Sequence, residues 1–359
     1  MREIQYKTFS WNTHSKNWQR NRPNACQFEL TFKCGLHCRH CYTECYNQSA
    51  YAKKELKTKE IKFILDKLHQ AGIIWLCLTG GDPLTRKDFL DIFAYAKDKG
   101  FIITVFTNGY SMSRETASFL KRRPPFVIEM TLNAVSKDLY ERISQVKGSL
   151  AKVMKGIDLI LKNGIALKIK TQITRDNLGE VPRIKKFIQG LGKTFRPGVD
   201  LFSRLDGDSA PCSLRISAQD ILSLNGKNRR ADDGCRIVSE ERLPLVRLDP
   251  SKGKRAPGAG LFNCAIAGGD GFNIDPSGRM FLCNLIRKPS FSLLKTNIDD
   301  AQNKLLSEAR GKKFVSRTKC TGCGLRGVCS WCPGKAYLET GDMEAPLEYY
   351  CRLASLSAS

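Results

Sequence analysis

Three cysteines lie close together near the start of the chain, in the segment Cys34-Gly35-Leu36-His37-Cys38-Arg39-His40-Cys41. Their CxxxCxxC spacing places three thiols on one short loop. Three thiolates can hold three irons of a cubane 4Fe–4S cluster, and the fourth iron is then open to an incoming chelating ligand. A structural zinc ion is the alternative, but zinc normally takes four ligands at CxxC-type spacing. Cys45 is expected to be a bystander, because a fourth ligand would close the site.

A second group of cysteines lies in the last hundred residues. It consists of Cys264, Cys283, Cys320, Cys323, Cys329, Cys332 and Cys351. Nothing in the first twenty residues has the apolar core of an export signal, so the fifteen cysteines of the chain are more readily metal ligands than disulfides. Paired CxxC spacings suit a zinc ribbon as well as iron–sulfur clusters, and the spacing alone leaves both open.

The cysteine loop follows the first of six predicted strands, which alternate with helical patterns. The expected strands are Cys26–Phe32, Trp75–Thr79, Ile102–Thr107, Phe126–Leu132, Ala166–Ile173 and Val199–Leu205. Apolar residues with helical spacing fill the gaps, as in the stripe that runs from Ile61 to Leu68, with Thr58 as its N-cap and Gly72 as its stop. Strands alternating with helices predict an α/β fold with a parallel sheet, and six units predict an incomplete (β/α)6 TIM-like barrel.

The composition changes twice after the barrel, which divides the chain into segments. Residues 1–25 form an N-terminal extension, 26–205 the barrel, 206–260 a bridging segment and 261–359 a small cysteine-rich domain. Within the last of these, 271–275 and 279–283 flank Pro276-Ser277-Gly278 and predict a β-hairpin.

Polar motifs follow three more of the predicted strands. They are Thr79-Gly80-Gly81-Asp82-Pro83, Thr107-Asn108-Gly109 and Thr131-Leu132-Asn133. In βα barrels the functional groups sit at the C-terminal ends of the strands. Each motif alone could be an ordinary turn, but their order on consecutive strands favours one shared pocket.

The four motifs together resemble those of the radical S-adenosylmethionine (SAM) superfamily, over roughly residues 24–205. Tyr42 stands where that family often has an aromatic residue after the third cysteine. The resemblance implies that Cys34, Cys38 and Cys41 hold a 4Fe–4S cluster whose open iron chelates SAM, and that reduction releases a 5′-deoxyadenosyl radical. It further implies a SAM pocket lined by residues of the strand-end motifs. These are Tyr42, Gly80, Gly81, Asp82, Asn108, Thr131 and Asn133.

The seven later cysteines resemble those of the SPASM domain, which carries two auxiliary 4Fe–4S clusters. The family pattern assigns Cys264, Cys283 and Cys332 to the cluster nearer the barrel. It assigns the outer cluster to four others: Cys320, Cys323, Cys329 and Cys351. The eighth cysteine of fully ligated members is absent, so the nearer cluster is expected to have an open iron or an oxygen ligand such as Asp270. Cys26, Cys77, Cys212 and Cys235 are expected to be core or bridging residues.

The resemblance predicts an enzyme that modifies a peptide or protein, either as an oxidoreductase or as a cross-linking maturase of a ribosomally made peptide. Alternatives are a sulfatase-type maturase and a maturase of a redox cofactor or haem precursor. Sulfatase maturases carry an aspartate after the last cysteine of the hairpin, whereas Asn284 stands here and cannot act as a base. A nucleic-acid substrate is a further alternative because the formal charge is +24, but no aromatic–basic stacking pattern supports it.

The same reasoning predicts the partners and the compartment. The resemblance implies an electron donor such as flavodoxin or ferredoxin. About twenty-five residues precede the first strand, too few for a leader-binding domain of ~80 residues. Leader recognition is therefore expected to fall either to a separate leader-peptide-binding protein or to the enzyme's own basic surface. The longest apolar run, Ile73 to Leu78, is far shorter than the ~20 residues that span a bilayer. The expectation is a cytoplasmic protein without a membrane segment.

Overall fold

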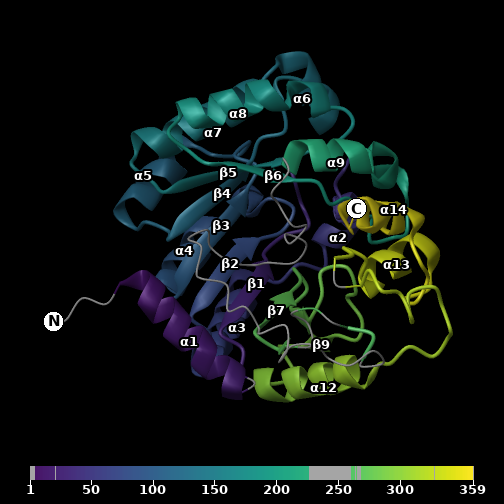
Figure 1. The fold of residues 1–359 in the computed structure, drawn as a ribbon. Helices are drawn as coiled ribbons and strands as arrows, with labels where there is room; N and C mark the ends of the chain where they lie inside the picture. The colour runs from purple at the N-terminus through teal and green to yellow at the C-terminus, as the bar shows by residue number, and fades with distance from the viewer. Residues whose placement is uncertain are drawn as a thin grey trace.

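The computed structural model describes residues 5–20, 22–225, 260–262, 264, 268–326 and 328–358. Nine strands form one sheet in the order β6-β5-β4-β3-β2-β1-β7-β8-β9 (Figure 1). The strands are β1 (Ala25–Glu29), β2 (Trp75–Thr79), β3 (Ile102–Thr107), β4 (Val127–Thr131), β5 (Leu167–Gln172), β6 (Phe195–Gly198), β7 (Gly271–Ile274), β8 (Arg279–Phe281) and β9 (Phe291–Ser292). Strands β1 to β6 are parallel, which confirms the predicted α/β class and partial barrel.

Helices connect the parallel strands and cover one face of the sheet. The α-helices of the described residues are α1 (Tyr6–Arg20), α2 (Ser49–Ala52), α3 (Thr58–Gln70), α4 (Phe89–Asp98), α5 (Arg114–Arg122), α6 (Lys137–Ser144), α7 (Ser149–Lys162), α8 (Val181–Gly190), α9 (Ala218–Asn225), α12 (Ile298–Gly311), α13 (Pro333–Thr340) and α14 (Glu348–Ala358). Short 3-10 turns are η1 (Glu44–Tyr46), η2 (Pro83–Thr85), η3 (Leu178–Glu180) and η4 (Ala210–Leu214).

Five of the six predicted barrel strands form where the sequence places them, with ends that shift by a few residues. The sixth prediction, Val199–Leu205, was wrong, since the strand that pairs with β5 is Phe195–Gly198. Val199–Leu205 is rich in apolar residues, as a strand would be, but its Leu201 and Ser203 are buried without ladder pairing. Pro197 is tolerated in β6 because the strand lies at the sheet edge, where a missing N–H costs little. The predicted N-cap of α3, Thr58, is also off by one residue, since Lys57 holds that place.

The two faces of the partial barrel differ in polarity. On β3, Ile103 and Val105 are fully buried beneath the helices, as are Ile128 on β4 and Ile169 on β5. The alternate residues face the concave side and are half-buried, and many are polar or charged. Among them, Glu129 pairs with Lys170 and with Arg196, 3.6 Å away. The concave face is therefore a polar lumen whose opening lies where the strands end.

The predicted hairpin is confirmed as β7 and β8, and it extends the barrel sheet rather than standing apart. Strand β7 pairs in parallel with β1, so that Cys26 lies opposite Phe272. Beyond the hairpin, both guanidinium nitrogens of Arg287 donate to the carboxylate of Glu29, at 2.8 and 2.7 Å. Glu29 is 5% exposed, so this ion pair joins the C-terminal segment to the end of β1 largely shielded from water. The proposed division at residue 261 stays a prediction.

Replacing Arg287 with methionine is expected to lower the free energy of unfolding by about 3–5 kcal/mol, because the Glu29 charge would be buried without a partner. Burial already raises the pKa of Glu29, and Arg287 opposes that rise. Without Arg287 the folded-state pKa rises further above the unfolded one. The loss is therefore largest at neutral pH and shrinks as the pH falls. Anaerobic urea unfolding at several pH values measures it.

Arg279→Met on the same hairpin is the matched control, because Arg279 is exposed. Arg279→Met should lower the free energy of unfolding by less than about 1 kcal/mol. A loss for Arg287→Met that equals the control, or that does not depend on pH, would contradict the buried-pair explanation.

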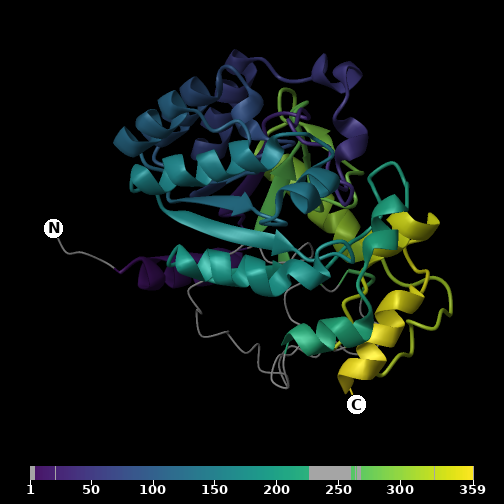
Figure 2. The same cartoon turned by 90° about the horizontal axis from the view of Figure 1, so that it is seen from above.

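The C-terminal helices pack against the last part of the barrel. Leu353 of α14 shares an apolar cluster with Ile221 of α9 and Ile173, and the two helices lie side by side in both views (Figures 1 and 2). Arg215 donates to Glu339 of α13, and the hydroxyl of Tyr350 donates to Asp200 at 2.9 Å. These contacts hold the last two helices against the strand ends.

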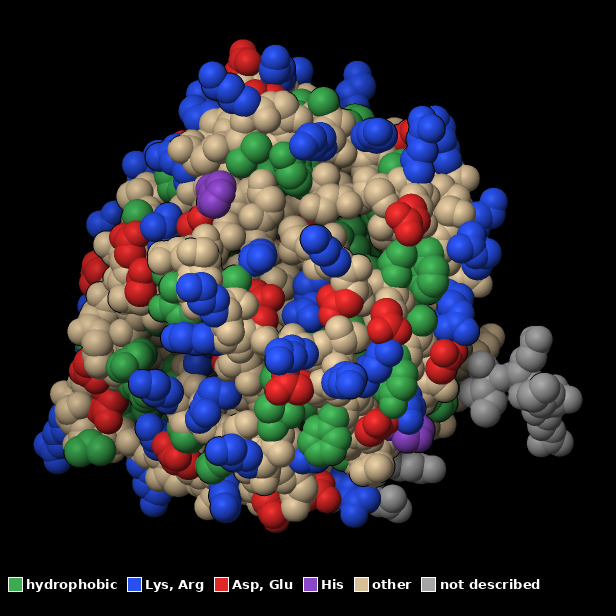
Figure 3. Space-filling view, turned by 180° about the vertical axis from the view of Figure 1, so that it is seen from behind, with side chains coloured by type: hydrophobic (Ala, Val, Ile, Leu, Met, Phe, Trp, Pro, Cys, Tyr) green, Lys and Arg blue, Asp and Glu red, His purple; other side chains and the backbone are tan. Residues whose placement is uncertain are grey.

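Positively charged side chains are spread over the outer surface rather than gathered in one patch. Figure 3 shows lysine and arginine side chains across the whole of one face, with acidic side chains among them. Within the described part of the chain, no helix has both the length and the apolar character needed to cross a membrane.

Candidate active site at the ends of the barrel strands

The cysteine loop leaves the end of β1 and stays paired with the segment that follows β2. The N–H of Leu30 donates to Thr79, that of Gly81 to Thr31 and that of Asp82 to Lys33, each at 2.8 Å. Backbone pairing between the two segments therefore continues past the strands as far as the residue before Cys34. This pairing fixes the position of the Gly80-Gly81-Asp82 motif relative to Cys34.

Gly80 and Gly81 are required by this close approach. A Cβ on Gly80, whose φ is +137°, would lie 2.4 Å from the carbonyl oxygen of Thr31. A Cβ on Gly81 would lie 2.3 Å from the carbonyl oxygen of Lys33. Both distances are far inside van der Waals contact with backbone atoms. The prediction that these glycines admit SAM stays a prediction. Independently of SAM, the close backbone of Thr31 and Lys33 leaves no room for a larger side chain at either position.

The three thiols of the loop lie close enough to affect one another's titration. Burial raises the pKa of Cys38, and the sulfurs of Cys41 and Cys34 raise it further. N–H groups point at the sulfur of Cys34, from the backbone of Leu36 at 3.4 Å and from the side chain of Asn108 at 3.2 Å. Such donors stabilise negative charge on a thiolate.

This donor set fits the cluster that the sequence predicts. Within the described ranges, no three His, Cys, Asp or Glu side chains are gathered as they would be around a single metal ion. A cubane cluster instead distributes its thiolates over separate irons and is tuned by hydrogen bonds to sulfur. Cys34, Cys38 and Cys41 are the residues that would hold it.

Asp82 is fully buried, and its hydrogen bonds join the end of β2 to the end of β3. Its carboxylate accepts from the N–H of Leu84 at 3.0 Å, from the hydroxyl of Thr107 at 2.8 Å and from the N–H of Asn108 at 3.1 Å. Burial raises the pKa of Asp82 to about 6, although these hydrogen bonds oppose the rise. Both carboxylate oxygens are thus occupied within the chain. The prediction that they contact SAM stays untested.

Replacing Asn108 with alanine is expected to shift the midpoint potential of the cluster on the cysteine loop to a more negative value. The Asn108 side chain donates to the Cys34 sulfur, and a lost N–H donor leaves the more negative, reduced cluster less stabilised. An EPR-monitored redox titration, following the signal that responds to added SAM, measures this shift. Asn163→Ala at the end of α7 is the control, and equal potentials in the two variants would contradict the expectation.

Asn133 joins the cysteine loop to the end of β5. Its side-chain oxygen accepts from the N–H of Gln172 at 2.9 Å, and its nitrogen lies 3.3 Å from Nε2 of His40. Among the described residues, Nδ1 of His40 and Nε2 of Gln172 are buried without a hydrogen-bond partner. Two unpartnered buried polar atoms next to the cysteine loop fit a polar ligand such as SAM.

Sequence reasoning missed three residues that shape this pocket. Burial lowers the pKa of His40 to about 4, so its ring is neutral at pH 7. Asn177 is fully buried and donates to the backbone oxygens of Asn133 and Gln172, at 2.8 and 2.9 Å. Arg39 pairs with Asp176 at 2.6 Å and ties the cysteine loop to the same region. The only signal available was the position of Asn177 just after a predicted strand.

The remaining predicted pocket residues lie around the same opening. Tyr42 packs edge to face against Phe202, with ring centroids 5.2 Å apart, and its backbone oxygen accepts from Leu205. Thr131 ends β4 and is half-buried on the concave side. The structure thus brings all seven predicted pocket residues to one edge of the barrel.

The C-terminal cysteines separate into two groups. Burial raises the pKa of Cys283 to about 12, and the sulfurs of Cys332 and Cys264 contribute. Burial also raises the pKa of Cys320, with added effects of Cys351, Cys329 and Cys323. These are the two sets that the family pattern predicts, although their metal content remains a prediction.

Asp270, the suggested oxygen ligand, has a carboxyl group whose pKa is raised by burial, and its backbone oxygen accepts from Asn24 at 3.1 Å. Cys26 and Cys77 are buried core residues on β1 and β2. Cys212 lies 3.5 Å from the hydroxyl of Ser203. Cys235 lies outside the described residues.

Comparison with known proteins agrees with this geometry. Residues 28–186 match the model of the Radical SAM superfamily. The chain carries a radical SAM domain and is a radical SAM enzyme.

Two curated relatives span most of the chain. The AdoMet-dependent heme synthase of Methanosarcina barkeri is 24% identical over 90% of this chain and 94% of its own length. The subtilosin biosynthesis protein AlbA of Bacillus subtilis is 26% identical over 86% of this chain and 67% of its own length.

Among solved structures, SuiB of Streptococcus suis has a similar fold. Its TM-score is 0.64 at 14% identity, and the match covers 95% of this chain and 81% of that one. SuiB has been solved with S-adenosylmethionine and with the precursor peptide SuiA.

Proposed function

We propose that this enzyme cleaves SAM reductively and uses the resulting 5′-deoxyadenosyl radical to modify a peptide, as a maturase of a ribosomally made peptide. The observation that carries this proposal is the CxxxCxxC loop at the open end of a parallel half-barrel, beside unpartnered buried polar atoms. When bound, the cluster supplies one electron that breaks a carbon–sulfur bond of SAM. A donor such as flavodoxin or ferredoxin would replace that electron.

The chain's own residues position the reactants. Cys34, Cys38 and Cys41 hold the cluster, and Gly80 and Gly81 let the backbone beneath the loop approach closely. Asp82 fixes the N–H of Asn108, and the Asn108 side chain points its own N–H at the Cys34 sulfur. Asn133, His40 and Gln172 would offer hydrogen bonds to the polar parts of SAM. The polar lumen below would receive the substrate.

The C-terminal cysteines would hold two auxiliary 4Fe–4S clusters in a SPASM-type domain, which makes three clusters per chain. Three ligands, Cys264, Cys283 and Cys332, would hold the nearer cluster, so its fourth iron would take an oxygen, a nitrogen or a substrate sulfur. The electrostatic grouping of the sulfurs supports this assignment.

A peptide substrate is favoured by the relatives. AlbA is named for biosynthesis of the bacteriocin subtilosin, and SuiB binds a precursor peptide. Recognition of the leader would fall to a separate protein or to the basic surface of the enzyme. A haem precursor is the second candidate, because a heme synthase matches over nearly its whole length.

The test is substrate-dependent formation of 5′-deoxyadenosine by the anaerobically reconstituted full chain. Dithionite, SAM and the peptide encoded by a short neighbouring reading frame are combined, and the products are followed by chromatography and mass spectrometry. A peptide mass change that requires SAM supports the proposal. If the mass change appears in an iron-porphyrin precursor and in no peptide, the peptide assignment is wrong.

A further inference from the structure

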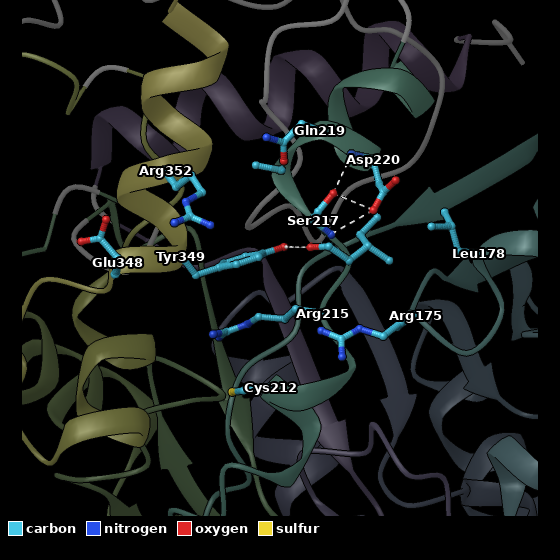
Figure 4. Close-up of a pocket in the computed structure, with 12 residues that line it drawn as sticks. Arg175, Leu178, Cys212, Arg215, Ser217, Gln219, Asp220, Glu348, Tyr349 and Arg352 are labelled. Atoms are coloured by element: carbon cyan, nitrogen blue, oxygen red, sulfur yellow. Dashed lines mark hydrogen bonds between the residues drawn. The ribbon is translucent and has the colours of Figure 1, made fainter.

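A cavity of about 530 Å³ lies where the end of the barrel meets the C-terminal helices. Its walls come from three places: Arg175 and Leu178 after β5, the segment of Ile216 and Ser217 before α9, and Tyr349 and Arg352 of α14 (Figure 4). The hydroxyl of Tyr349 donates to the backbone oxygen of Ile216 at 3.2 Å and closes one side. The site predicted from the sequence does not include this cavity.

Two arginines of the cavity have no carboxylate partner within the described part of the chain. Arg175 and Arg352 are exposed, and neither forms an ion pair with a residue that the structure describes. Figure 4 shows them reaching into the hollow from different elements. Arg215, by contrast, is 8% exposed and is held by Glu339 and by the backbone oxygen of Leu201.

The two acidic residues of the wall are already engaged. Asp220 accepts from the hydroxyl of Ser217 at 2.6 Å and from its N–H at 3.2 Å. Glu348 lies 3.5 Å from Lys319. Hydrogen bonds from the neutral Ser217 leave the negative charge of Asp220 in place. Among the described wall residues, the unpaired charges are therefore those of Arg175 and Arg352 against that of Asp220, an excess of one positive charge.

Two residues of the cavity wall are sequence neighbours of residues linked to the two kinds of cysteine site. Asp176, next to Arg175, pairs with Arg39 inside the CxxxCxxC loop. Arg352 follows Cys351, which belongs to the outer group of C-terminal cysteines. A ligand in the cavity would thus be held beside the opening of the barrel.

We propose that this cavity binds a carboxylate of the substrate, an acidic side chain or a C-terminus, between Arg175 and Arg352. Guanidinium groups present a planar set of donors that match a carboxylate. Leu178, Ile216 and the ring of Tyr349 supply apolar surface for the neighbouring part of the ligand. The assignment of that carboxylate to a peptide rests on the proposed function.

The test uses the reconstituted full chain and two nonapeptides, amidated at the C-terminus and labelled with a dye that has no carboxylate. They carry glutamate or glutamine at the centre of an otherwise identical Gly/Ala/Leu sequence. The glutamate peptide is expected to bind at least about tenfold more tightly, since hydrogen bonds from a guanidinium to a charged carboxylate are stronger than those to a neutral amide. The double variant Arg175→Gln/Arg352→Gln should lose that preference. Arg122→Gln on α5, an exposed arginine far from the cavity, should retain it. Fluorescence anisotropy measures binding, and the iron–sulfur absorbance checks folding.

A third probe, a porphyrin with four carboxylates, separates the two sources of the carboxylate. Arginine-dependent binding of the porphyrin without binding of the glutamate peptide would overturn the peptide assignment and the proposed function with it. A double variant that keeps the glutamate preference would overturn the carboxylate site. That result would not contradict the proposed function, because peptide-dependent formation of 5′-deoxyadenosine tests the proposed function separately.

Discussion

Replacing Cys34, Cys38 and Cys41 together with alanine is expected to abolish formation of 5′-deoxyadenosine. The bound iron should fall only from about twelve to about eight atoms per chain, because two of three cubane clusters remain. The physical reason is that the cluster proposed for the cysteine loop would be the site of SAM reduction, whereas the C-terminal cysteines form separate groups. Iron and sulfide analysis and a dithionite-driven assay measure both quantities.

Cys45→Ala is the matched control, since Cys45 lies four residues beyond Cys41 and is not needed as a ligand. It should keep the full iron content and the SAM cleavage. Formation of 5′-deoxyadenosine by the triple variant would contradict the assignment of the SAM-cleaving cluster to this loop. A total of about four irons in the parent enzyme, with zinc in the C-terminal groups, would refute the three-cluster proposal.

Gly81→Ala is expected to have the second largest effect, a loss of about 2–3 kcal/mol in the free energy of unfolding together with most of the SAM-cleaving activity. The added Cβ would meet the carbonyl oxygen of Lys33 at 2.3 Å. That oxygen belongs to the backbone of the residue before Cys34, so the clash cannot be relieved by a side-chain rotation. The cysteine loop itself must move. Thermal unfolding under anaerobic conditions and the EPR signal of the SAM-responsive cluster report the two effects.

Gly190→Ala at the end of α8 makes the same chemical change where nothing lies within 4 Å of the new Cβ. It should be neutral or slightly stabilising, since alanine is the better helix former. If Gly81→Ala behaves like Gly190→Ala, the backbone pairing beneath the cysteine loop does not position the site.

The barrel was predictable because its signals are local. Strands such as Trp75–Thr79 and Ile102–Thr107 are short apolar runs bounded by helical stripes, and the hairpin has a Pro-Ser-Gly turn. The sixth strand was misplaced because pairing with β5, not local apolar content, decides which residues join the sheet. No local pattern shows that β7 pairs with β1, since the two strands are separated by most of the chain.

The candidate site was also predictable in part. The spacing of Cys34, Cys38 and Cys41 is itself a ligand pattern, so the loop could be found from the residues alone. The buried hydrogen bonds of Asp82 depend on Thr107 and Asn108 from the next strand, and a sequence does not show such contacts. His40 was overlooked because its neutral, buried state arises only from packing. The arginines of the cavity come from segments nearly two hundred residues apart.

The parallel pairing of β1 with β7 also sets the order of events on the ribosome. The inner edge of β1 finds its permanent neighbour only when Gly271 has been made, some 240 residues after β1 itself. At ~5–20 residues per second, that edge waits roughly 10–50 s with its backbone groups unpaired. An open edge of this kind is a template for wrong pairing with other chains. Expression yield should therefore depend on translation speed and on chaperones more than the stability of the finished fold suggests.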